Sequence, residues 1–96
     1  MSSQTILIDT DPSGGFIYER PLFAEVLAIR TNVGDLETPN IVISDPDAGT
    51  LRTLTGLSAD DLWQPGTGIV VFGTLRVVVT GGGDTKHGSI RLLTWG

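Results

Sequence analysis

The aspartate-rich stretch near the amino terminus is the part of the sequence that comes nearest to a known metal-binding motif. It reads Asp9-Thr10-Asp11-Pro12-Ser13-Gly14, with oxygen-bearing side chains at its first, third and fifth positions and glycine at its sixth, like the start of a calcium-binding loop. Its twelfth position is Arg20, where such loops carry a bidentate glutamate. Aspartates beside proline and glycine commonly accept hydrogen bonds from their own turn. We therefore predict that Asp9 and Asp11 form a turn and that this stretch binds no metal.

The single histidine is the other residue whose chemistry suggests catalysis. His87 follows Lys86 in the glycine-rich run 81–88, and the chain has no second histidine and no cysteine. A metal centre or an activated nucleophile requires several converging groups. The run also lacks the ending of a phosphate-binding loop, and the sequence after it is rich in strand-forming residues. We predict a solvated histidine in a hairpin loop, no catalytic residues, no cofactor and no enzymatic activity.

Two tryptophans are candidates for contact with a ligand or a partner. Trp63 and Trp95 could stack on a sugar or pack in a protein interface, because indole rings serve both roles. In the alternative interpretation, Trp63 covers the core as a lid and Trp95 lies at a strand end. Both are kept as interface candidates.

Length and charge narrow the class of protein. Ninety-six residues suffice for one domain, residues 1–96. Eleven acidic and six basic side chains give a net charge of −5, which repels nucleic acid and anionic membranes. No apolar run reaches the roughly 18 residues that span a bilayer, and Met1–Thr5 lack the features of a signal peptide. We expect a soluble protein that binds neither nucleic acid nor membrane.

Composition predicts strands rather than helices. Valine, isoleucine and threonine supply 28 residues, whereas alanine, glutamate, lysine and glutamine supply 10. Glycine and proline divide the chain into segments of strand length. The segments predicted as strands are Thr5–Asp9, Phe16–Val33, Ile41–Ser44, Thr50–Thr55, Ile69–Phe72, Leu75–Thr80 and Ile90–Trp95.

Three places in this pattern leave a choice. Phe16–Val33 also fits a helical spacing in part, and we choose a strand, confined by Pro21 to an edge or a bulge near its start. The Ser58–Asp61 segment resembles a helix start, but Pro65 limits it to one turn at most. Gly73 predicts a bulge or bend between two strands. The expected fold is all-β, a small antiparallel sandwich or a jelly-roll-like barrel.

Three further segments resemble those of a known class of protein. They are Ile6–Thr10, Val26–Arg30 and Leu75–Ile90. The last is the most distinctive, with a strand, a glycine-rich turn ending in aspartate-threonine-lysine, and a glycine that opens a final apolar strand. Together they resemble small β-rich virion structural proteins of tailed bacteriophages. Residues 38–68 have no counterpart in this resemblance.

The resemblance implies a capsid cement or decoration protein that stabilises the head shell through symmetric contacts with the major capsid protein. A phage neck or tail component is the nearest variant. The implied location is the virion, after assembly in the host cytoplasm. Two alternatives from other classes remain: a small carbohydrate-binding module and a small metal-dependent enzyme.

The surface expected of so small a domain suggests how it binds. A chain of this length exposes much of its surface, so some apolar side chains should lie outside and face a partner. We expect self-association as a homodimer or homotrimer, and binding to the major capsid protein, through strand edges and chain termini. The strand Thr5–Asp9 is expected to be unpaired and to add to a neighbour's sheet. The interface candidates are Thr5, Ile6, Leu7, Ile8, Asp9, Trp63 and Trp95.

Overall fold

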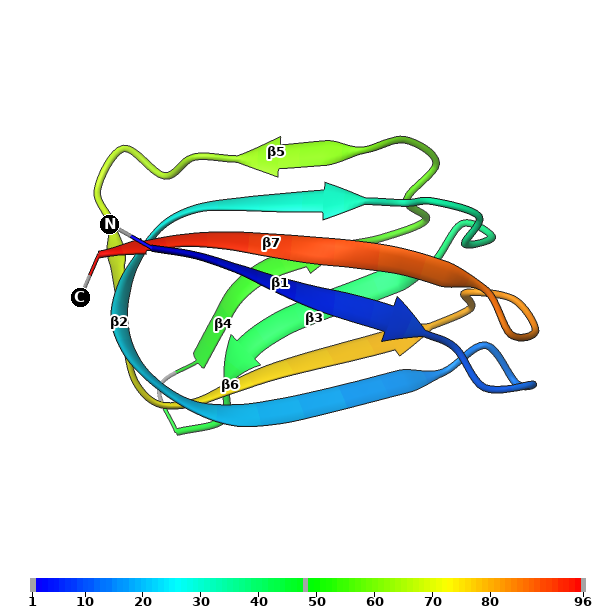
Figure 1. The fold of residues 1–96 in the computed structure, drawn as a ribbon, viewed down its shortest axis with the longest axis horizontal. Coiled ribbons are helices and arrows are strands. Elements are labelled where there is room, and N and C mark those ends of the chain that lie inside the picture. The colour runs from blue at the N-terminus through cyan, green and yellow to red at the C-terminus, as the bar shows by residue number, and fades with distance from the viewer. Residues whose placement is uncertain (1, 48, 96) are drawn as a thin grey trace.

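The computed structural model describes residues 2–47 and 49–95, which form seven β-strands (Figure 1). The strands are β1 (Ser2–Asp9), β2 (Phe16–Asn32), β3 (Asn40–Asp45), β4 (Gly49–Leu54), β5 (Asp61–Trp63), β6 (Ile69–Thr80) and β7 (His87–Trp95). All paired strands are antiparallel, and none of the described residues is helical. The prediction of an all-β fold is confirmed. A helix able to cross a membrane is accordingly absent from the described part of the chain.

The long strand β2 belongs to two layers. Its first half, Phe16–Val26, pairs with β6, and its second half pairs with β7 and, at residues 29–31, with β5. The register shifts between Val26 and Ala28, and a β-bulge at such a shift bends the strand. The bend lies at the left-hand end of Figure 1. One layer is therefore β1-β7-β2-β5 and the other is β2-β6-β3-β4. Of the two expected architectures, the sheet is compatible with the sandwich and does not close into a barrel.

The core between the layers is aliphatic. Buried and exposed residues alternate along the strands, because successive side chains of a strand point to opposite faces. On β1, for example, Ile6 and Ile8 are buried and Leu7 between them is exposed. Burying one such side chain contributes about 1.5–3 kcal/mol. The largest fully buried side chains are Ile8, Val26, Ile29, Thr31, Ile41, Ile43, Val71, Leu75, Val77, Val79, Ile90 and Leu92.

Side chains close the side of the sandwich where β4 faces β5. The Arg52 guanidinium on β4 lies 3.2 Å from both carboxylate oxygens of Asp61 on β5. The same guanidinium lies 5.8 Å from the ring centroid of Trp63, which packs against the core. Trp63 therefore acts as a lid on the core, as one of the two interpretations of this residue expected.

The long strand and the following hairpin agree with prediction. Phe16–Asn32 is one strand. Pro21 lies in its first half, which is paired on one side only, with β6, and forms an edge of the layer β2-β6-β3-β4. An edge position tolerates a residue without a backbone N–H group. Strands β3 and β4 form the predicted hairpin. Ala48 in its turn lies outside the described residues.

Three local predictions are corrected by the structure. The segment that begins at Ser58 forms no helical turn, because the Asp60 carboxylate accepts a hydrogen bond from the Val33 backbone N–H and the next residues pair with β2 as β5. Gly73 neither divides its strand nor forms a bulge: β6 runs through it in constant register, and the carboxylates of Asp45 and Asp47 lie over it. The start of β6 does curve beside β2 at the left-hand end of Figure 1. His87 lies in β7 rather than in a loop, because it pairs with Asp9 of β1.

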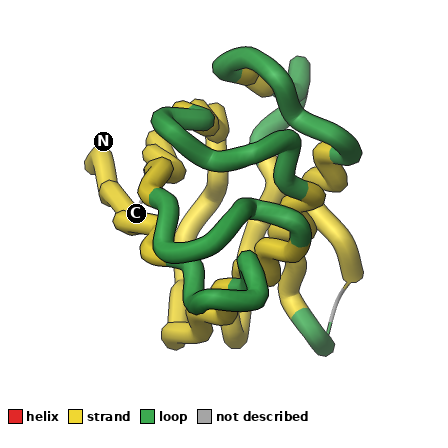
Figure 2. The backbone as a smooth tube through the Cα atoms, turned by 90° about the vertical axis from the view of Figure 1, so that its right-hand side faces the viewer, coloured by secondary structure: helices red, strands yellow, loops and turns green. Residues whose placement is uncertain are grey.

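Loops gather at the end of the sandwich that faces the viewer in Figure 2. Backbone hydrogen bonds join three of these loops. The Gly82 N–H donates to the Gly14 oxygen at 2.9 Å, the Glu37 N–H to the Gly82 oxygen at 3.0 Å and the Thr10 N–H to the Lys86 oxygen at 3.0 Å. Satisfied backbone groups fix the loops to one another at this end.

Candidate functional site

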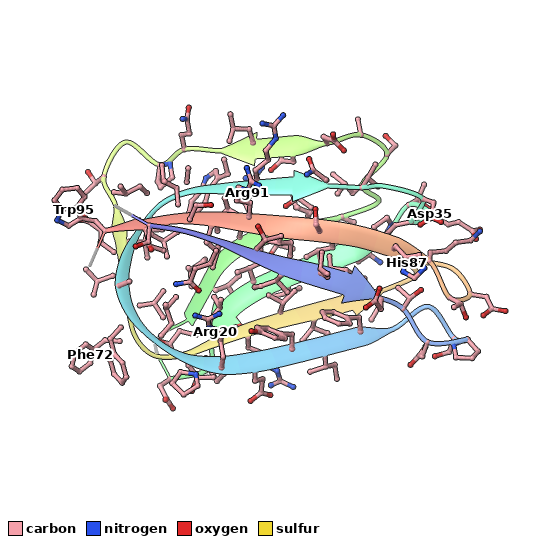
Figure 3. All side chains as sticks on the ribbon, viewed as in Figure 1. Arg20, Asp35, Phe72, His87, Arg91 and Trp95 are labelled. Carbon is pink, nitrogen blue, oxygen red and sulfur yellow. The ribbon has the colours of Figure 1, made fainter. Side chains whose placement is uncertain are left out.

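A group of exposed apolar side chains lies at the bend of β2, at the end opposite the loops. Phe23 on β2 and Phe72 on β6 are direct cross-strand neighbours, 62% and 78% exposed, and their rings meet edge to face with centroids 5.1 Å apart. Val70 follows on the same face of β6 and is also exposed. Trp95 of β7 lies at this end as well (Figure 3). We call Phe23, Val70, Phe72 and Trp95 the corner patch.

Strand register explains why these side chains share one end of the molecule. Glu25 is paired with Val70 on one side and with Trp95 on the other, so β7, β2 and β6 present one outward row at the bend. The side chain of Glu25 lies over Gly68, where a Cβ atom would overlap it. A glycine at position 68 thus lets the carboxylate fold down beside the patch, and the aromatic rings remain exposed.

The corner patch is chemically suited to contact with a protein. Aromatic side chains are enriched in the buried centres of interfaces, where each removes a large apolar area from water. Fully burying one phenylalanine contributes about 1.5–3 kcal/mol relative to leaving it exposed. Two adjacent phenylalanines with this exposure keep that free energy available for association.

Strand β1 supplies a second accessible feature, an edge of the sheet. It pairs with β7 over all of its eight residues, and no other described strand pairs with it. The expectation of an unpaired strand is therefore wrong: one side of β1 is paired and one is free. An edge of this kind can accept a strand from another chain.

The interface candidates from the sequence do not form one surface. Of the five candidates on β1, Ile6 and Ile8 are buried in the core, and Thr5, Leu7 and Asp9 are exposed. Leu7 is 68% exposed, because its position in the alternation directs it to the outer face.

The two tryptophans also lie apart. Trp63 is half-buried under Arg52 on β5, whereas Trp95 is exposed at the end of β7. Only Trp95 belongs to the corner patch. Phe23, Val70 and Phe72 were missed, because the apolar runs around them gave no indication of which face would lie outside. Leu22 and Ala24 are buried and Phe23 between them is exposed. Which of the two alternating sets faces the core becomes clear only once the strand register is known.

Polar side chains cluster at the loop end instead. The His87 ring Nδ1 lies 2.7 Å from Oδ1 of Asp9, and both side chains are exposed (Figure 3). The Asp35 carboxylate accepts a hydrogen bond from the His87 backbone N–H, which lowers the pKa of that carboxyl group. Within the described residues, no hydroxyl group is hydrogen-bonded to the His87 ring. The pair thus joins β1 to β7 across the sheet end.

The predicted aspartate turn is present in part. Oδ1 of Asp11 accepts hydrogen bonds from the Ser13 N–H at 2.9 Å, the Ser13 hydroxyl at 2.7 Å and the Gly15 N–H at 3.0 Å. Asp11 is therefore turn-forming, as predicted, and Asp9 is not part of the turn because it ends β1. Within residues 2–47 and 49–95, no three acidic or histidine side chains converge to form a cation site.

Comparison with known proteins adds no relative: no protein-family model matches the sequence, and no curated protein matches it significantly.

Proposed function

We propose that the protein is a non-enzymatic structural protein of a phage virion, acting as a cement or decoration protein on the head shell. The observation that carries this proposal is the corner patch, in which Phe72 is 78% exposed beside Phe23. The resemblance of Leu75–Ile90 to small virion proteins supplies the biological context. The partners proposed are further copies of the chain and the major capsid protein.

Energetics support assembly in many copies. Four apolar side chains make a small contact, and a single contact of this size holds two proteins weakly once the loss of rotational and translational freedom is subtracted. A symmetric lattice engages the same patch on every subunit, so weak contacts combine through multivalency. The free edge of β1 offers main-chain hydrogen bonds for a second contact.

Self-association is tested by analytical ultracentrifugation of the intact protein and two serine variants. Phe72→Ser removes the most exposed ring of the corner patch, and we expect it to lower the association constant by about tenfold or more. Ile17→Ser is the matched control, because Ile17 is 63% exposed on the same strand as Phe23 but lies six residues from it. We expect the control variant to associate like the intact protein.

Shell binding is tested by cosedimentation with particles assembled from the major capsid protein of the same genome. The intact protein and Ile17→Ser should occupy a fixed number of sites per particle, and Phe72→Ser should lose occupancy. An intact protein that stays monomeric and never binds the particles contradicts the proposal. Full occupancy by Phe72→Ser would show that the corner patch does not contribute to shell binding.

A further inference from the structure

The outer face of the layer β1-β7-β2-β5 contains a hollow of about 290 Å³. Two rows of cross-strand neighbours form it. One row runs from Ser3 through Leu93 to Ala28, and the small side chains at both of its ends leave space above the sheet. The hollow shares no residue with the corner patch, although Leu93 at its edge and Trp95 of the patch lie on the same face of β7.

The second row places two arginines side by side. Arg91 of β7 is directly opposite Arg30 of β2, and Arg30 is in turn opposite Leu62 of β5. Both arginines are exposed, and both line the hollow (Figure 3 labels Arg91). Directly opposite side chains have Cβ atoms about 4.5–5.5 Å apart, so the two positive charges repel each other.

Two of the other three arginines are paired with carboxylates, whereas this pair, within the described residues, is not. Arg52 lies 3.2 Å from Asp61, and Arg76 lies 3.3 Å from Glu19. Among the residues that the structure describes, no carboxylate lies within salt-bridge distance of Arg30 or Arg91. This occurs in a chain with eleven acidic side chains and a net charge of −5. Two guanidinium groups without a carboxylate partner in the described part of the chain, over one hollow, are electrostatically complementary to an anion.

The chemistry of the hollow limits that anion. Paired guanidinium forks match the planar oxygens of a carboxylate. Leu62, Leu93 and Ala28 make the rest of the hollow largely apolar, so the ligand must also carry an aliphatic part. The volume lies at the lower end of the range for ligand sites, which suits one or two side chains. The net negative charge of the chain disfavours a polyanion.

We propose that this hollow binds a glutamate or aspartate side chain of a partner protein, with an adjacent aliphatic residue against the leucines. The carboxylate lies between Arg30 and Arg91 and relieves their repulsion. Leu62 and Leu93 contact the aliphatic neighbour, and Gln64 at the margin offers an amide for hydrogen bonding to the partner backbone. This inference does not rest on the proposed virion function, since it is argued from Arg30, Arg91 and the lining of the hollow, none of which belongs to the corner patch.

The test is a titration of the full chain by NMR, following backbone amide shifts. The probes are acetyl-Leu-Glu-Leu-amide, its glutamine analogue acetyl-Leu-Gln-Leu-amide and inorganic phosphate. We expect the glutamate peptide to shift the amides of residues 28–30, 62–64 and 91–93, and to bind about tenfold or more tightly than the glutamine analogue, because a hydrogen bond to a charged group is lost in the analogue. Raised salt should weaken the binding.

Two variants control for the site. Arg91→Gln should weaken binding of the glutamate peptide by about tenfold or more. Arg76→Gln removes an arginine of the other layer and should leave the peptide affinity unchanged. Equal binding of both peptides, shifts located outside the hollow, or phosphate bound as tightly as the glutamate peptide would each overturn the assignment. A protein that stays monomeric and never binds the capsid particles, but binds the glutamate peptide as expected, would contradict the virion proposal and leave this one intact.

Discussion

Neighbouring aspartates with the same sequence surroundings perform different tasks in this protein. Asp11 accepts three hydrogen bonds from its own turn, whereas Asp9 ends β1 and pairs with His87 across the sheet. The turn residues predicted the first role from local chemistry alone. The second depends on the register of β1 and β7, which brings together residues 78 positions apart. Local rules therefore describe Asp11 and are insufficient for Asp9.

The hydrogen bonds at Asp11 predict a pH dependence. The Gly15 backbone N–H first, and then the Ser13 hydroxyl, lower the pKa of the Asp11 carboxyl group in the folded state. A carboxyl group whose pKa is lower folded than unfolded stabilises the fold above its unfolded pKa, and the contribution is lost as pH falls through the folded pKa. We expect Asp11→Ala to lower the free energy of unfolding at pH 7, and the difference from the intact protein to shrink in acid.

Urea unfolding of both proteins, at neutral pH and at a pH below the titration of the carboxyl group, measures this difference. Asp84→Ala is the comparison, because Asp84 accepts a hydrogen bond only from its neighbour Thr85 within the described residues. It should change stability little at either pH. A constant effect of Asp11→Ala across the whole range would show that the charge is not involved.

Two glycines separate backbone strain from steric overlap. Gly34 and Gly56 both have positive φ, +56° and +58°. An added Cβ would overlap the His87 backbone oxygen at Gly34 and would meet nothing within 4 Å at Gly56. We expect Gly56→Ala to lower the free energy of unfolding by about 1–2 kcal/mol, because alanine is strained in the left-handed conformation. Gly34→Ala should cost roughly 1–3 kcal/mol more, because the overlap forces the backbone of β7 to move.

Chemical denaturation of the two alanine variants, fitted with the same slope, gives the comparison. Equal destabilisation would mean that the Gly34 segment moves freely away from β7.

At the scale of elements, composition and the positions of glycine and proline predicted most of the strands. β2 was recovered as one strand from Phe16 to its end, and the β3–β4 hairpin was recovered from its proline-aspartate turn. The errors share one cause, which is that tertiary contacts outweigh local propensity. β5 is a strand because β2 is available to pair with it, and Gly73 is tolerated because neighbouring carboxylates occupy the space above it.

The paired arginines also have a consequence for stability. Like charges directly opposite each other on a sheet are destabilising by about 0.2–1 kcal/mol. We therefore expect Arg91→Thr, which keeps a β-branched residue in the strand, to raise the free energy of unfolding by that amount at low salt. Added salt should reduce the gain, because it already screens the repulsion in the intact protein.

Thermal or urea unfolding at low and high ionic strength measures this effect. The matched variant Arg76→Thr should show the opposite sign or no change, because Arg76 is paired with Glu19. A loss of stability in Arg91→Thr would mean that the arginine contributes packing that exceeds the repulsion.

At the scale of the whole molecule, the sequence predicted the layers better than the surfaces. Periodicity shows which residues of a strand share a face, and so the core residues could be predicted in part. It does not tell which strands become neighbours, and so the row of Trp95, Glu25 and Val70 was not predictable. The same holds for Arg30 and Arg91, which lie 61 positions apart in the chain and become neighbours only through the register of β2 and β7. Both proposed contact surfaces arise from strand order.

The bend in β2 makes a final prediction about cooperativity. Because one strand runs through both layers, neither layer can lose β2 without disturbing the other. We therefore expect the two layers to unfold as one unit, in a single two-state transition. Both tryptophans lie on strands of the layer that contains β5 and β7, whereas Ile43 is fully buried on β3 in the other layer. Ile43→Ala should cost about 2–5 kcal/mol, the range for truncating a buried isoleucine.

The measurement is urea unfolding of Ile43→Ala and the intact protein, followed in parallel by tryptophan fluorescence and far-ultraviolet circular dichroism. In a coupled molecule, the fluorescence midpoint falls by the same amount as the dichroism midpoint, although no tryptophan lies in the layer that was changed. Ile17→Ala is the matched control in the same layer as Ile43. It should change the free energy of unfolding by no more than about 0.5 kcal/mol by either probe, because Ile17 is exposed. If Ile43→Ala shifts the dichroism transition and leaves the fluorescence transition in place, the layers unfold separately and the bend is a flexible connection rather than a shared structural element.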